Sequence, residues 1–156
     1  MTQRPVVDVG GLLAGFMAQV PAASRPRFLA LLERGAATRY RYWAEQLPAH
    51  AEGLRACAAR EEEIADRADR VVPIDAGARE KLEALVPSAR EAYFAIFDGV
   101  PILEQLRIQA GAERLGAGAW RGMAAALTDA HAREVLDGCA LLEEVSASYL
   151  DTLVAG

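Results

Sequence analysis

The sequence predicts an all-α fold in which four long helices pack as two antiparallel hairpins. Alanine, leucine, arginine and glutamate, which favour helices, fill most segments. Alternating runs of β-branched residues, which would indicate strands, are missing from the sequence. Four long segments each carry apolar residues at steps of three and four, so each has one apolar face to bury. Helices of this kind bury those faces against one another in a helical bundle.

Length, composition and charge restrict the class of protein. The chain has 156 residues, 53% of them apolar, which fits one domain over residues 1–156 with a substantial core. Its 17 basic and 22 acidic residues give a net charge of −5, which argues against binding of nucleic acid through bulk electrostatics. Two cysteines do not make a disulfide framework, so we expect a reducing, cytoplasmic setting.

An apolar stretch lies near the start of the chain, from Val9 to Val20. It is shorter than the roughly 20 apolar residues that a membrane span needs. Only Arg4 among basic residues precedes it, and Asp8 adjoins it, which is unlike a secretion signal. We therefore expect no membrane partner. The stretch predicts a short helix over about residues 8–19, which either covers part of the core or forms a contact between subunits.

Proline, glycine and capping residues divide the rest of the chain into helices. Ser24 with Pro26, and Thr128 with Asp129, are typical of helix starts, whereas Pro87 before Ser88 predicts a break. The predicted helices cover residues 25–47, 49–72, 76–86, 88–98, 101–127 and 129–154. The first hairpin then spans about 25–72, the crossover 73–100 and the second hairpin 101–154. We expect the arginines of 25–47 to pair with the acidic residues of 49–72.

The two predicted hairpins resemble each other in sequence, which indicates an internal duplication. Residues 33–47 align with residues 113–127 at an offset of 80, and the offset grows to 82 after the turns. Alanine pairs are common by chance, so they add little to this inference. It depends on matches between less frequent residue types, or between residues that occur in the same order in both hairpins. They are Glu33 with Glu113, Arg34 with Arg114, His50 with His131, Cys57 with Cys139, Glu61 with Glu143 and Glu62 with Glu144. In the same alignment Tyr40 faces Trp120, an aromatic residue for an aromatic residue.

One glutamate of each long helix lies on the apolar stripe, where a carboxylate is costly to bury. These residues are Glu33, Glu61, Glu113 and Glu143. Each lies about 13 to 16 residues from its own hairpin turn, so antiparallel packing brings all four to the middle of the bundle. Four inward carboxylates repel one another unless metal ions, protons or nearby arginines compensate them. Oxygen ligands of this kind suit Fe, Mn, Mg or Ca.

A duplicated helical hairpin with a long crossover and one inward glutamate per helix resembles the ferritin-like superfamily, which includes rubrerythrins and di-iron carboxylate enzymes. The resemblance covers about residues 25–154. It implies that Glu33 and Glu113 are the single metal-binding glutamates. It also implies that Glu61 and Glu143 open two Glu-x-x-His motifs.

The histidines of those two motifs are absent from this sequence. Ile64 and Ser146 stand where the resemblance requires histidine, and the neighbouring register has Ala65 and Ala147 there. The two histidines of the chain, His50 and His131, lie at the starts of two helices, where we expect them near the surface. The resemblance therefore implies an all-oxygen metal site or no metal site.

Two classes of function follow from these residues. The first is a carboxylate protein that binds Fe or Mn through Glu33, Glu61, Glu113 and Glu143 and acts as an oxidoreductase or hydroxylase. The second is a metal-free ferritin-like bundle that serves as a binding or assembly module. A third option is a helical protein that binds a hydrophobic ligand among its Tyr, Trp and Met residues. No residue is assigned as catalytic.

The expected partner is a second copy of the chain. The apolar N-terminal stretch and residues 94–97, Phe-Ala-Ile-Phe, are the candidates for a self-association surface.

Overall fold

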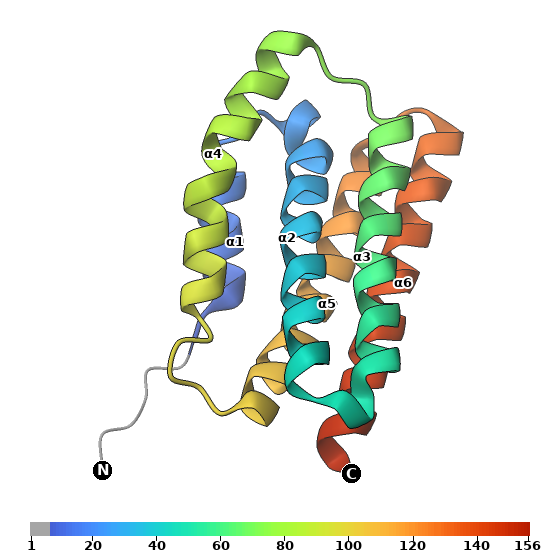
Figure 1. Cartoon of the computed structure of the whole chain (residues 1–156). Helices are drawn as coiled ribbons and strands as arrows, with labels where there is room; N and C mark the ends of the chain where they lie inside the picture. Colours follow the sequence, from blue (N-terminus) through green and yellow to red (C-terminus); the bar gives the residue numbers. More distant parts are fainter. Residues whose placement is uncertain (1–6) are drawn as a thin grey trace.

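The computed structural model describes residues 7–156, and all regular structure within that range is helical. This confirms the all-α prediction. The four long helices of the two hairpins begin and end close to the predicted residues (Figure 1). The helices are α1 (Val9–Met17), α2 (Arg25–Gln46), α3 (Ala51–Val71), α4 (Ala76–Ala95), α5 (Ile102–Ala126) and α6 (Ala130–Ala155), with 3-10 turns at Ala22–Ser24 and Pro48–His50.

Two antiparallel hairpins form the centre of the fold. Helix α2 packs on α3 and α5 packs on α6, while α3 against α6 and α2 against α5 join the hairpins to each other. The α2–α3 turn lies at the end of the molecule that also holds the C-terminus, and α6 begins at the opposite end (Figure 1). Helix α4 runs alongside the hairpins between these ends (Figure 1).

Helices α1 and α4 lie outside the hairpins. Helix α4 packs against α2, and α1 packs against α5. Under α4 lies a small apolar cluster that includes Phe28, Leu82 and Val86. Helix α1 has no buried residue of its own, so it covers the hairpins without adding a core.

Two larger apolar clusters fill the space between the hairpins. One contains Leu29, Ile64 and Trp120, and the other contains Tyr40 and Trp43. Along each of the four long helices, the predicted inward glutamate lies between residues of the first cluster and residues of the second. The glutamates therefore form a polar layer across an otherwise apolar interior.

The predicted break at Pro87 is wrong, because α4 continues through it to Ala95. A proline within a helix removes the hydrogen bond to the carbonyl four residues earlier, here that of Glu83. Both Pro87 and Glu83 are exposed, so water can replace that bond. The helix start predicted at Ser88 is therefore wrong as well, because Ser88 lies inside α4. Ser24 also makes no side-chain cap, whereas Asp129 accepts from the Ala132 amide as predicted.

Ion pairs join α2 to α3, as the sequence predicts. The Arg34 guanidinium lies 2.8 Å from Glu62 and 2.9 Å from both Asp66 and Asp69. These side chains are partly exposed, so each pair contributes on the order of 0 to 1 kcal/mol to stability. The pairs therefore link α2 to α3 at the edge of their contact, while the apolar clusters account for most of the packing.

The proposed self-association surface at residues 94–97 is wrong in part. Phe97 is only 2% exposed and packs edge-on against Trp43, and Phe94 is half-buried. The ring of Phe97 belongs to the interior because α4 packs on α2 and brings the following residues over Trp43. Within residues 7–156, the structure contains no helix that is long and apolar enough to cross a bilayer.

The packing of the core makes a direct prediction about stability. Leu136 of α6 is 0% exposed, and Leu141 on the same helix is 58% exposed. We expect Leu136→Ala to lower the free energy of unfolding by about 2 to 5 kcal/mol because it leaves a cavity. Leu141→Ala is the matched control and should change it by less than about 0.5 kcal/mol. Urea unfolding of both variants measures the difference, and equal effects would contradict this packing.

Candidate metal centre

The four predicted glutamates all point into the interior, one from each long helix. Glu33 of α2 is 7% exposed, Glu61 of α3 is 0%, Glu113 of α5 is 2% and Glu143 of α6 is 1%. They come together because the hairpins cross over end to end, which brings the middle of each helix to the same level. Burial of four acidic side chains in one layer is the feature of this molecule that most requires a chemical explanation.

Three of the four carboxylates form a compact group. One oxygen each from Glu33, Glu61 and Glu143 lies within 4.8 Å of the others, a spacing that could hold a metal ion. Glu113 lies beside this group and has donors of its own. Its Oε1 accepts hydrogen bonds from the Tyr40 hydroxyl at 2.6 Å and from the Gln109 amide at 2.7 Å.

The remaining oxygens have few donors. The Trp120 indole donates to Glu143 Oε1 at 3.1 Å. Both oxygens of Glu61 and the Oε2 atom of Glu113 are buried, and no N–H or O–H donor of the described chain reaches them. None of the ion pairs among residues 7–156 includes any of the four glutamates. The charge of this layer is therefore not neutralised by side chains of the described part of the chain.

Burial raises the pKa values of Glu33, Glu61 and Glu143. It raises the pKa of Glu33 to about 7, and hydrogen bonds with Glu143 and Glu61 limit the rise. Burial and then the charge of a neighbouring glutamate raise the pKa of Glu61 and Glu143 well above the ordinary value. Carboxylates accept hydrogen bonds but do not donate them, so Glu33 and Glu61 can bond to each other only through a proton.

The positions that the resemblance assigns to histidine have other roles. Ile64 is fully buried in the apolar cluster with Trp120. Ser146 accepts a hydrogen bond from Arg60 Nε at 2.9 Å, and the same guanidinium donates to Cys57 Sγ at 3.2 Å. Ile64 therefore packs in the core and Ser146 binds Arg60, and neither residue offers a nitrogen ligand.

The other notable side chains lie where the sequence suggested. His50 and His131 are exposed, and they lie at opposite ends of the hairpins. Cys57 and Cys139 are buried and free. Burial raises the pKa of the Cys139 thiol to about 12, so it stays protonated and acts as a small apolar group.

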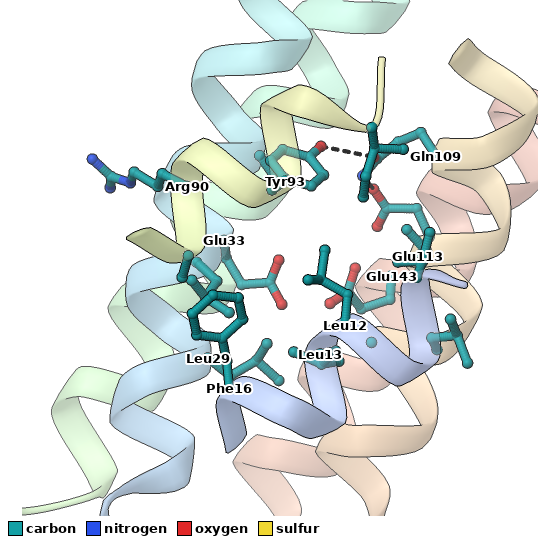
Figure 2. Close-up of a pocket in the computed structure, with 18 residues that line it drawn as sticks. Leu12, Leu13, Phe16, Leu29, Glu33, Arg90, Tyr93, Gln109, Glu113 and Glu143 are labelled. Carbon is teal, nitrogen blue, oxygen red and sulfur yellow. Dashed lines mark hydrogen bonds between the residues drawn. The ribbon is translucent and has the colours of Figure 1, made fainter. Parts of the chain in front are cut away.

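A pocket of about 100 Å³ opens above the carboxylates (Figure 2). Its walls come from α1, α2, α4 and α5, and the carboxylates of Glu33, Glu113 and Glu143 point toward its centre. The Tyr93 hydroxyl of α4 donates to Gln109 Oε1 at 2.6 Å across one side of the pocket. A chain of hydrogen bonds thus runs from Tyr93 through Gln109 to Glu113.

Three residues of the site were not predicted from the sequence. Gln109 is 3% exposed and lies one turn before Glu113 on the same helix face. Its position as a second polar residue on the apolar stripe could have identified it from the sequence. Gly116 is also in the layer, since a Cβ there would lie 2.7 Å from Glu143 Oε1. Tyr93 reaches the site from α4, and nothing in its local sequence indicates this position.

Comparison of the chain with protein-family models, with curated proteins and with solved structures finds no match. The chemistry of the donor set therefore has to indicate the ligand. Carboxylate oxygens are ligands for hard divalent cations, and the two oxygens of Glu61 accept no hydrogen bond from an N–H or O–H group of the described chain. The residues present fit a metal ion bound through oxygen alone, and they do not provide the imidazoles of a mixed nitrogen and oxygen site.

Gly116 allows a test of how tightly the layer is packed. A methyl group at this position would meet the Glu143 carboxylate, which Trp120 holds in place. We expect Gly116→Ala to lower the free energy of unfolding by about 1 kcal/mol or more. Gly118→Ala on the same helix, where a Cβ meets nothing within 4 Å, should raise it by up to about 1 kcal/mol. Chemical denaturation compares the two, and stabilisation by both variants would show that Glu143 moves freely.

The raised pKa values predict how stability depends on pH. A glutamate ionises near 4.5 in the unfolded chain, whereas Glu33 ionises at about 7 in the folded protein. Between these values the folded state binds more protons, so the stability of chelator-treated protein should fall as the pH rises from about 4.5 to 7. Glu33→Gln should remove a share of this loss on the order of 3 kcal/mol.

Urea unfolding at pH 5 and pH 7.5 measures this dependence. Glu134→Gln, which alters an exposed carboxylate of α6, is the control and should keep the wild-type dependence. The raised pKa of Glu33 would be contradicted if the free energy of unfolding rose with pH. It would also be contradicted if Glu33→Gln had the same pH dependence as the wild type.

Proposed function

We propose that this protein is a ferritin-like carboxylate metal protein that binds Fe or Mn through Glu33, Glu61, Glu113 and Glu143. The observation that carries the proposal is the environment of Glu61, which is fully buried with no donor for either oxygen. A carboxylate in that position is stable only beside a cation or when protonated. A divalent ion compensates several of the four charges at once.

The arrangement of the helices supports the ferritin-like part of the proposal. Two antiparallel hairpins are joined by a connection that crosses from end to end, and each helix contributes one inward glutamate. Positions paired by the proposed duplication also have related roles. Tyr40 donates to Glu113, and its counterpart Trp120 donates to Glu143.

The side chains of the layer would have different roles in holding a metal ion. Glu33, Glu61 and Glu143 already have oxygens within 4.8 Å of one another, so they form the first set of ligands. Glu113 adds its unpartnered Oε2, while Tyr40 and Gln109 fix the orientation of its carboxylate through Oε1. The apolar clusters on both sides of the layer exclude water and strengthen each electrostatic interaction.

Bound iron or manganese would supply one-electron redox chemistry, which carboxylate side chains do not provide. The proposed activity is therefore that of an oxidoreductase or hydroxylase. The pocket above the layer gives a small molecule a route to the carboxylates. Tyr93 and Gln109 line this route and connect it to Glu113 through hydrogen bonds.

A metal-free ferritin-like bundle is the second candidate, and a specific observation favours it. Ile64 and the Arg60–Ser146 hydrogen bond occupy the places of both histidine ligands. In this candidate, protons shared among the carboxylates compensate their charge in place of a metal ion, in accordance with the raised pKa of Glu61. The protein then serves as a binding or assembly module. Self-association is part of either proposal, and the exposed Leu103 of α5 is a candidate for its contact.

Metal analysis separates the two candidates. Protein purified without chelator should contain stoichiometric Fe or Mn, and Glu61→Gln should lose it. Adding Fe(II) or Mn(II) at 100 times the dissociation constant should stabilise the metal-free wild type by about 2.7 kcal/mol. This corresponds to roughly 5 to 10 °C in Tm for a chain of this size.

Two controls make the result specific. Glu63→Gln alters a partly exposed glutamate of α3 that pairs with Arg67, so it should keep full metal content. In the absence of metal, Glu61→Gln should be more stable than the wild type at pH 7.5, because folding no longer requires a carboxylate that is ionised in the unfolded chain to take up a proton. Protein without metal, and with a Tm that Fe(II) and Mn(II) do not change, would exclude the metal centre and leave the second candidate.

A further inference from the structure

The pocket above the carboxylate layer has two chemically different ends. Its walls are apolar over most of their extent, with Leu12, Leu13, Phe16, Leu29, Leu32 and Leu115 among the lining residues. Its inner end is formed by the carboxylates of Glu33, Glu113 and Glu143 (Figure 2). A ligand that fits both ends has an apolar body and one polar group.

The charge of the inner end indicates which polar group. Glu113 is 2% exposed, its carboxylate points toward the centre of the pocket, and its Oε2 atom has no donor. Arg90 is the only basic residue in the wall formed by the described residues. Its guanidinium points away from the pocket and donates to the Leu31 carbonyl at 3.3 Å. The acceptors of the pocket therefore have no cation of the described chain to pair with.

We propose that this pocket binds a small aliphatic primary amine, with its ammonium group at Glu33, Glu113 and Glu143 and its alkyl chain between α1, α2 and α5. An ammonium group offers three donors and a positive charge, which matches three carboxylates at the end of an apolar cavity. This goes beyond the proposed metal centre and does not depend on it, because the ammonium binds the carboxylates directly.

The size of the cavity limits the ligand. A cavity of about 150 Å³ lined by apolar side chains accommodates benzene, so one of about 100 Å³ fits a ligand of about four to six non-hydrogen atoms. An amine with a second charged group at its far end should bind more weakly. That group would lie unpaired among the leucines and Phe16.

The test compares n-butylamine, 1-butanol and 1,4-diaminobutane as probes of chelator-treated protein. Leucine methyl groups labelled with 13C report binding by NMR. We expect n-butylamine to cause saturable shifts at Leu12, Leu13 and Leu29, and none at the exposed Leu141. The alcohol has the same shape without the charge, so it should bind about tenfold more weakly or worse. The diamine should bind more weakly than n-butylamine.

Two variants locate the ligand. Ala112→Leu places a larger side chain at the pocket wall and should weaken n-butylamine binding at least tenfold. Ala119→Leu is the control, because it alters a residue of similar exposure on the same helix outside the pocket, and it should bind n-butylamine as the wild type does. Ala112→Val, a smaller change with the same direction of effect, serves if the leucine variant does not fold. Glu113→Gln should weaken the amine much more than the alcohol.

The proposal is overturned if the amine and the alcohol bind equally, if shifts at Leu141 match those at the pocket, or if the Ala112 variants bind as the wild type does. Metal content is measured on the same preparations. Amine binding by a chain that takes up no metal would reject the metal centre and retain the amine site. Metal uptake without amine binding would do the reverse.

Discussion

The structure depends on the burial of four carboxylates in a single layer. Removing one charged group from water costs several kcal/mol even after the surroundings relax, and a domain is stable by only about 5 to 15 kcal/mol in total. Four ionised glutamates without compensation would exceed that margin. The hydrogen bonds from Tyr40, Trp120 and Gln109 reach two of the four groups and leave Glu61 without a donor. A cation or shared protons must therefore belong to the stable state of this protein.

Most of the fold could be predicted from the sequence because long amphipathic helices signal their own buried faces. The stripes in α2, α3, α5 and α6 predicted both the extent of these helices and which side lies inside. Pro87 misled the prediction because the effect of a proline depends on whether the affected carbonyl faces water, which the local sequence does not reveal. Phe97 was predicted to be free for self-association, but its burial depends on where α4 ends relative to Trp43.

The candidate site was predictable where it follows helix periodicity and unpredictable where it depends on contacts between distant helices. A glutamate on an apolar stripe is visible in the sequence, and all four such residues lie in one layer. The separate orientation of Glu113 depends on Tyr40 and Gln109, whose contacts form only once the helices are packed. Tyr93 and the pocket depend on α1 and α4, which lie outside the hairpins and contribute few residues to the two central apolar clusters.

The distribution of the acidic residues between the hairpins has a consequence for the order of folding. Each hairpin contributes only two carboxylates, Glu33 and Glu61 from one and Glu113 and Glu143 from the other. A hairpin that forms alone can keep its two acidic groups in water, since the face that bears them is covered by the other hairpin together with α1 and α4. The electrostatic cost then arises when the hairpins meet. Docking of two preformed halves, rather than the formation of either half, is the kinetic step that acid or a divalent cation should accelerate.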